Sequence, residues 1–304
     1  MGISSSPVKY DFLSPRMRAL APYLILALAI FAVYFNIYDN AFVFDDDTLI
    51  ATNDYLRGWG HIGDILTGAT TDGAHLSHGN YRPLQILLYL LLFNLGGGSV
   101  FLFHLLNTSL HAANTCLVYR LGTKLNFMPW PTFLAALTWG VHPIHTEAIT
   151  YMSGTADLLF AFFCLLALVI LLPSFTSRNI FNVIPLFLLG LLSKETAVMF
   201  PLLVMACLYL THPQRFRVRT YMRTWPLWVI TIVYFIWRLN DSSFSGPQSF
   251  AHDYTSPPLA DKLYIENLAY RIYTFMATLP AYLSLIVNPV DLHFERVFPV
   301  YADL

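Results

Sequence analysis

A succession of long apolar runs is the feature that most constrains the fold of this chain. A helix needs about 20 predominantly apolar residues to cross a bilayer, and several runs approach or reach that length. Only 12% of the residues are charged while 56% are hydrophobic, which is too little charge to cover a water-soluble globule of this size. We therefore expect an all-α integral membrane protein, with apolar runs at about 19–38, 83–95, 99–121, 130–151, 155–173, 180–193, 196–211, 225–239 and 263–288.

Charge balance and cysteine content exclude several other classes of protein. The 17 Lys and Arg residues nearly cancel the 18 Asp and Glu residues, so we expect no nucleic-acid partner bound through a basic face. The 3 cysteines form no CxxC motif, which indicates neither a disulfide framework nor a thiolate metal site. The first apolar run is long and no small-residue cleavage site follows it, so we interpret it as a retained helix.

The distribution of Lys and Arg predicts the orientation in the membrane. Basic residues cluster at the N-terminus, at 120–124, at 178 and in 212–224, which contains no acid, and loops of this kind face the cytoplasm. The run at 83–95 is short for a span, so we expect an interfacial or re-entrant helix there. The polar segments that then share the exoplasmic side are 39–82, 142–157, 193–196 and 240–262.

Three adjacent carboxylates, Asp45, Asp46 and Asp47, follow the first apolar run in a long acidic loop. Carboxylates so close together repel one another, which raises at least one pKa or attracts a cation. One of them could accept a proton from a nucleophilic hydroxyl, or the group could hold a divalent metal ion. The alternative is a solvated acidic loop that only reflects membrane orientation.

His142, His145 and Glu147 form a second polar group. Two histidines three residues apart share a face of a helix, although Pro143 perturbs that geometry. A zinc site and a phosphate- or sugar-binding cavity are possible interpretations, and a polar helix end at the membrane interface is the alternative.

His104, Asn107, His111 and Asn114 lie at helical spacing, so they share one helix face. Polar residues inside a membrane face the bundle interior or a water-filled cavity. They either form hydrogen bonds between helices or line a cavity.

Two cations, Arg82 and Lys194, complete the polar inventory. A Lys between two short apolar runs is costly unless it is paired, and Glu195 points elsewhere on a helix, so we expect an anionic partner such as a ligand phosphate. Arg82 could clamp a phosphate in bidentate fashion. The alternative for both residues is anchoring at the membrane interface. Together, these groups suit a substrate that is linked to a lipid phosphate.

The polar motifs also resemble a known family, the transmembrane-and-tetratricopeptide-repeat O-mannosyltransferases and their bacterial relatives. Their order and spacing match over nearly the whole chain. The matching residues are Phe42-Val43-Phe44-Asp45-Asp46 with Leu49-Ile50 and Asn53, Tyr81-Arg82-Pro83-Leu84, Phe103-His104 with Asn107 and His111, His142-Pro143-Ile144-His145-Thr146-Glu147-Ala148, Ser153-Gly154 with Ala156-Asp157-Leu158-Leu159, and Lys194-Glu195.

The resemblance implies a GT-C-type multi-helix transmembrane bundle whose long first exoplasmic loop carries short interfacial helices. It implies transfer of a sugar, mannose in the animal members, from a polyprenyl or dolichyl phosphate to Ser or Thr hydroxyls of a protein. The catalytic acid of the first exoplasmic loop falls on Asp45 or Asp46, and we expect Asp45 to be the base. The substrate-contacting residues that we predict are Arg82, His104, His142, His145, Glu147, Asp157, Lys194, Glu195 and Arg271.

In this hypothesis the phosphate of the departing lipid is stabilised by Arg82, Lys194, Arg271 or a divalent cation. The side chains that could hold such a cation are Asp45, Asp46, His142 and His145. We expect a multi-pass protein of the bacterial inner membrane or the endoplasmic reticulum membrane.

Two departures from the family pattern stand out. Thr155 occupies a place where the family pattern leads us to expect Arg, and no tetratricopeptide repeat is found in 1–304, which we interpret as one transmembrane domain truncated at its C-terminus. The rival interpretations are a transporter or lipid-binding membrane protein without glycosyl transfer, and an inactive scaffold of the same fold.

Overall fold

The computed structural model describes residues 14–76, 80–213, 216–240, 267–290 and 292. These residues form helices and connecting turns with no β-strand among them, which confirms the all-α prediction for the described part of the chain. The α-helices are α1 (Pro15–Val33), α2 (Ile62–Thr67), α3 (Pro83–Gly96), α4 (Val100–Lys124), α5 (Pro129–Gly140), α6 (Thr146–Thr150), α7 (Thr155–Leu171), α8 (Ser177–Ser193), α9 (Phe200–Thr211), α10 (Val218–Met222), α11 (Trp225–Asn240) and α13 (Leu268–Val287).

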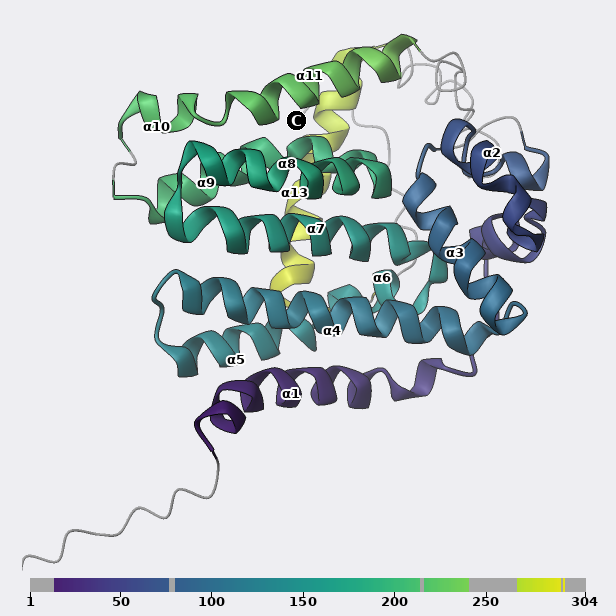
Figure 1. The fold of residues 1–304 in the computed structure, drawn as a ribbon, viewed down its shortest axis with the longest axis horizontal. Helices are drawn as coiled ribbons and strands as arrows, with labels where there is room; N and C mark the ends of the chain where they lie inside the picture. The colour runs from purple at the N-terminus through teal and green to yellow at the C-terminus, as the bar shows by residue number, and fades with distance from the viewer. Residues whose placement is uncertain (1–13, 77–79, 214–215, 241–266, 291, 293–304) are drawn as a thin grey trace, which may run out of the picture.

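The long helices lie side by side in a bundle (Figure 1). Helix α4 packs against α1, α5 and α7, and α7 packs in turn against α8. The largest buried apolar cluster joins α7, α8 and α9 through side chains such as Leu168, Phe187 and Val204. Because these helices bury one face against one another, they hold their ends, and the polar residues there, in fixed relative positions.

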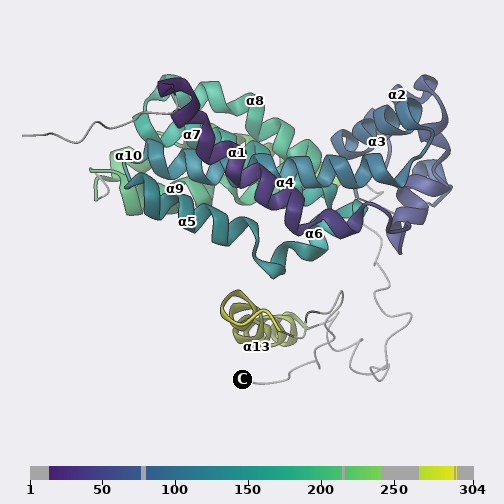
Figure 2. The same cartoon turned by 90° about the horizontal axis from the view of Figure 1, so that it is seen from below.

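The acidic loop folds into short helical turns against α3. Leu49, Leu56 and Ile65 are buried against Ile86 and Tyr89 of α3. Figure 2 shows α2 and α3 together at one end of the bundle. Helix α3 begins at Pro83, whose missing N–H and fixed φ suit the first helical position. The predicted short helix at 83–95 is therefore present.

The apolar run at 130–151, expected as one segment, is broken in the structure. Helix α5 ends at Gly140, and a 3₁₀ turn, Pro143–His145, separates it from α6. Pro143 cannot donate a backbone hydrogen bond and disfavours helical geometry at His142, which explains the break.

Helix α13 differs from the others in direction. It runs across the bundle in Figure 1 and lies to one side of it in Figure 2. A pocket separates its C-terminal half from α6.

Within the described part of the chain, two stretches are long and apolar enough to cross a membrane, Pro15–Val33 and Met152–Ser174. Shorter apolar helices lie at Pro83–Gly96, Ser177–Ser193 and Glu195–Thr211. Large apolar side chains such as Leu28 of α1 and Val233 of α11 are more than half exposed, as is typical of helices that face lipid. The bundle of many membrane-spanning helices stays a prediction.

Candidate functional site

The acidic turn separates its three carboxylates. Phe44 has a positive φ of 50°, which turns the chain sharply, and a π-helical turn begins at Asp47. Asp46 is only 1% exposed, whereas Asp45 and Asp47 are exposed. The local chain is therefore helical rather than extended, and the two candidate catalytic carboxylates still face different surroundings.

Asp46 is fixed by three hydrogen bonds. One of its carboxylate oxygens accepts from the backbone N–H of Ser153 at 2.9 Å and from its hydroxyl at 2.8 Å. The other accepts from the N–H of Val43 at 3.2 Å. Burial raises the pKa of Asp46, and these hydrogen bonds offset part of that effect. Asp46 thus ties the acidic turn to the start of α7.

Asp45 lies beside Tyr151. Its backbone N–H donates to the Tyr151 hydroxyl at 3.1 Å. Burial, together with the negative charge of Asp45, raises the pKa of the Tyr151 hydroxyl, so this group stays neutral. An exposed carboxylate at the edge of a pocket is a chemical group suited to the role of general base.

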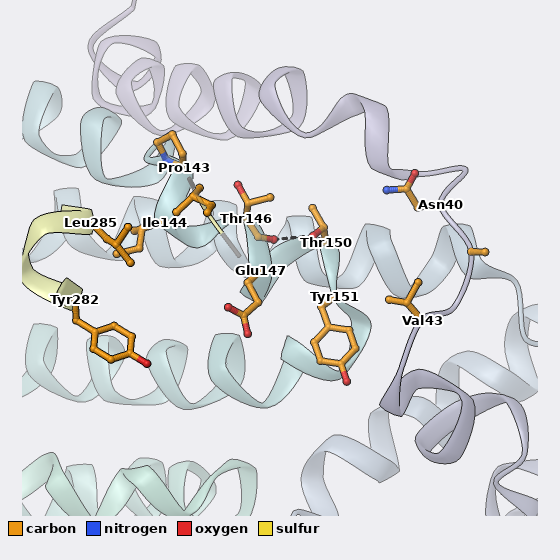
Figure 3. A pocket seen from close by; sticks show the side chains of 12 residues that line it. Asn40, Val43, Pro143, Ile144, Thr146, Glu147, Thr150, Tyr151, Tyr282 and Leu285 are labelled. Atoms are coloured by element: carbon orange, nitrogen blue, oxygen red, sulfur yellow. Dashed lines mark hydrogen bonds between the residues drawn. The ribbon is translucent and has the colours of Figure 1, made fainter. Parts of the chain in front are cut away.

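An open pocket of about 730 Å³ adjoins this acidic turn (Figure 3). It lies between the chain at 40–43, the segment Pro143–Tyr151 and α13. The side chains of Glu147 and Tyr151 point into it beside Tyr282 of α13. Its lining is apolar on the α13 side and polar along α6, and consists of Asn40, Ala41, Val43, Pro143, Ile144, Thr146, Glu147, Thr150, Tyr151, Tyr282, Leu285 and Leu292.

The two histidines of the second motif have separate contacts. His142 caps the Pro143–His145 turn by accepting from the N–H of Ile144 at 3.2 Å, and its Nε2 lies 3.1 Å from the carbonyl oxygen of Ile286 on α13. His145 packs 4.6 Å from the Trp139 ring, measured between ring centroids. Burial, with the neighbouring histidines, lowers the pKa of His145 to about 4.

The cations are paired with carboxylates. Arg82 donates two hydrogen bonds to Glu195, at 2.7 and 3.1 Å, and Lys194 lies 2.5 Å from Asp157 at the start of α7. The premise that Lys194 needs a ligand to pair its charge was therefore wrong. The reason is that α8 ends at Ser193, so Lys194 takes an extended conformation instead of continuing the helix. Burial would raise the pKa of Glu195, but the hydrogen bonds and charge of Arg82 outweigh it and lower that pKa.

The polar stripe of α4 is buried and fully within the bundle. Its side chains bond to backbone carbonyls of neighbouring segments: His104 to Asn40, Asn107 to Ile149, His111 to Gly140 and Asn114 to Leu158. These bonds match the interhelical alternative. Each of the four side chains thus has at least one partner within the bundle, although His104 Nδ1 and Asn114 Oδ1 have none among the described residues. The stripe was also the best sequence feature in favour of a transporter.

Three further expectations concern residues outside this group. Arg271 is exposed on the first turn of α13, and the residues of α13 that line the pocket lie in its last two turns. Thr155, where the family pattern has Arg, is 1% exposed and bonds to the Asn107 side chain at 2.5 Å. Among the described residues, no three His, Cys, Asp or Glu side chains converge as metal ligands, so Asp45, Asp46, His142 and His145 are not gathered into one site.

Three of the four predicted exoplasmic segments meet at one end of the molecule. The Asp46–Ser153 bonds join the acidic loop to 142–157, and the Arg82–Glu195 pair joins it to 193–196. The fourth segment, 240–262, lies almost wholly outside the described residues. Sequence reasoning missed Ser153 and Tyr151 as partners of the acidic turn, because neither residue type signals that role. Only Ser153 belongs to the family motif, and Tyr151 lies outside it.

Comparison with known proteins gives one consistent result. The chain is 33% identical over 160 residues to human "Protein O-mannosyl-transferase TMTC4", which covers 47% of this chain and 22% of that protein. The chain is similar to the TMTC proteins. It is also 32% identical over 186 residues to Tmtc1 of Drosophila melanogaster, with 58% of this chain and 21% of that protein covered.

A third relative extends the match further along the chain. The O-mannosyl-transferase F38B6.6 of Caenorhabditis elegans is 30% identical over 192 residues, which cover 60% of this chain and 27% of the relative. The predicted resemblance to the TMTC proteins is thus confirmed, over about half of the chain rather than nearly all of it. The chain spans about a fifth to a quarter of the length of these relatives. No family model matches the chain, and no solved structure matches it.

Proposed function

We propose that this chain is the membrane part of a GT-C-type glycosyltransferase that moves a sugar, mannose by analogy with its relatives, to a protein Ser or Thr hydroxyl. The donor is a polyprenyl or dolichyl phosphate sugar, and the reaction takes place on the exoplasmic side. The names of the relatives support protein O-mannosyl transfer in general. One structural observation carries the rest: the exposed Asp45 adjoins Tyr151, which lines an open pocket, while its buried neighbour Asp46 anchors the turn.

The proposed step is a single displacement at the anomeric carbon. The acceptor oxygen forms a bond to that carbon and loses its proton to Asp45, while the bond from the carbon to the phosphate oxygen breaks. The lipid phosphate leaves with the electron pair of that bond. General-base assistance of this kind is worth roughly 10²–10⁴-fold in rate.

We assign the acceptor to the pocket beside Tyr151. Among the described residues, its lining contains a carboxylate, Glu147, and no Arg or Lys, which disfavours an anionic phosphate there. Its volume of about 730 Å³ lies within the range that small-molecule pockets occupy. A short peptide segment with one hydroxyl side chain fits both the size and the charge of this pocket.

We assign the donor phosphate to the side that carries Arg82 and Lys194. Both cations are mostly buried, with 16% and 21% of their side chains exposed, and each has one carboxylate partner. A phosphate that approaches them would share these cations with Glu195 and Asp157 and gain charge-assisted hydrogen bonds. Arg271 and a divalent cation remain part of the proposal as further partners of the phosphate.

The experiment is a transfer assay on the full-length protein in membrane vesicles. Radiolabelled dolichyl phosphate mannose and polyprenyl phosphate mannose are offered with Thr-containing peptides of a candidate acceptor. We expect label on the peptide with the wild type, and a loss of about 10²–10⁴-fold with Asp45→Asn. The matched control is Asp64→Asn, another exposed acid of the same loop, whose carboxylate bonds to His61. Uptake of the lipid-linked sugar without transfer would favour a transporter and refute the proposal.

A further inference from the structure

A second cavity lies at the opposite end of the molecule from the acidic turn. It measures about 690 Å³ and opens between the start of α8 and the segment that joins α10 to α11. Figure 1 shows α10 at the end of the bundle remote from α2 and α3. We call this cavity the basic pocket, and its lining residues are Ser177, Ile180, Phe181, Arg219, Met222, Arg223, Trp225 and Pro226.

The basic pocket concentrates positive charge. Arg219 and Arg223 are four residues apart, both are exposed, and both line the cavity, whereas no Asp or Glu among the described residues does. Like charges at this spacing repel each other, and an anion between them would relieve that repulsion. Among the described ion pairs neither guanidinium has a carboxylate partner. Ser177 adds the N-terminus of α8, a 17-residue helix, and so the positive end of its dipole.

Apolar side chains share the cavity with these arginines. Phe181, Met222 and Trp225 are 55%, 66% and 59% exposed. Free inorganic phosphate would leave these surfaces in water, whereas an amphiphile would cover them. Trp beside Arg is also the combination that helices present at a membrane interface. The ligand chemistry is therefore a phosphate group attached to an apolar body.

We propose that the basic pocket binds the head group of an anionic phospholipid. The phosphate lies between Arg219 and Arg223 near the start of α8, and the first part of the acyl chains lies along Phe181, Met222 and Trp225. Basic pockets between helices at the cytoplasmic side of membranes bind anionic lipids in this manner. This site is separate from the acidic turn, and it does not depend on the proposed glycosyl transfer.

Native mass spectrometry of the full-length protein released from detergent tests the proposal. The probes are a short-chain phosphatidylglycerol, a phosphatidylcholine of the same chain length, and glycerol phosphate. We expect phosphatidylglycerol to bind preferentially to the wild type. Arg219→Gln with Arg223→Gln should weaken its binding about 30-fold, since each basic residue contributes about fivefold near an anionic lipid. Arg219→Lys with Arg223→Lys should retain most of the affinity.

The matched control removes two positive charges elsewhere at the same end. Arg120 and Lys124, both exposed, lie on the last turns of α4 and line no described cavity. Arg120→Gln with Lys124→Gln should leave phosphatidylglycerol binding unchanged. Equal losses of binding in the two Gln double variants would overturn the proposal in favour of diffuse attraction to the basic surface. Equal binding of the two phospholipids would overturn it by showing no preference for the anionic head group. Displacement of phosphatidylglycerol by equimolar glycerol phosphate would show a site for free phosphate compounds and overturn the assignment to lipid.

Discussion

Replacing Asp46 by Ala is expected to destabilise the protein, whereas replacing Asp45 by Ala is not. Asp46→Ala removes the acceptor of three hydrogen bonds. Two of the three donors can find other partners, because Val43 is exposed to water and the Ser153 hydroxyl can rotate. The backbone N–H of Ser153 cannot, because Ser153 is only 8% exposed, so this donor is left without an acceptor. One unsatisfied buried donor costs about 1–3 kcal/mol. Asp45 is exposed, and changes at such surface positions stay within about 0.5 kcal/mol.

The burial of Asp46 can also be tested through the pH dependence of the protein's stability. Its pKa is raised in the folded protein, so its contribution to stability is fully present below the unfolded pKa of about 3.9. That contribution is lost as the pH rises through the higher folded pKa, because the carboxylate must then ionise while buried. Asp46→Asn cannot ionise, so its stability relative to the wild type should rise as the pH increases from about 4 into the neutral range.

The assay is thermal unfolding of the purified protein in detergent, followed by tryptophan fluorescence, with sugar transfer measured on the same samples. Asp46→Ala should lower the unfolding temperature clearly, and Asp45→Ala should leave it unchanged while abolishing most of the transfer. Equal unfolding temperatures for the two Ala variants would refute the anchoring role of Asp46. An active Asp45→Ala enzyme would refute the assignment of Asp45 as base.

Three further predictions use other parts of the site. The pKa of Glu195 is lower in the folded protein than its unfolded value of about 4.3, so Glu195 stabilises the fold above that value and loses this effect as the pH falls through its folded pKa. Glu195→Gln should therefore lose less stability on acidification than the wild type. Thermal unfolding between pH 6 and 3 measures the difference. Lys194→Met should raise the KM for the lipid donor in the transfer assay, and an unchanged KM with lower stability would show that Lys194 only pairs with Asp157. Thr52→Cys and Thr146→Cys place single thiols at exposed positions of the segments 39–82 and 142–157. Both should react with a membrane-impermeant thiol reagent from the same side of the membrane. Reaction from opposite sides would refute the prediction that the two segments share one side.

The helices were predictable because apolar run length and helix breakers are local properties of the chain. The stripe at His104, Asn107 and His111 indicated one buried face of a helix, and α4 has that face buried. The break after α5 was not predicted, although Pro143 was visible, because the run at 130–151 was bounded by its average composition, which does not distinguish a helix from a turn.

Charge pairing was harder to predict than helix position. Lys194 pairs with Asp157, 37 residues earlier, and Arg82 pairs with Glu195, 113 residues later. Such pairs depend on which helix ends the bundle brings together, and no local pattern encodes that. The sequence indicated all four of these charged residues as site residues, and the structure brings them together at one end. For the two cations it suggested an external anionic partner, whereas the chain supplies the carboxylates itself.

The two pairs also constrain how a donor phosphate could be held. A cation that already has a carboxylate partner is partly neutralised, so a phosphate gains less from it than from an isolated charge, but the cation is held in place before the phosphate arrives. Arg82 stands directly before α3, whose Gln85 donates to the carbonyl of Ser153, the residue that holds Asp46. Arg82 and the acidic turn are therefore connected by a short chain of contacts through α3 and Ser153. In this arrangement the same short chain of contacts that positions the proposed base also joins it to the proposed phosphate partner.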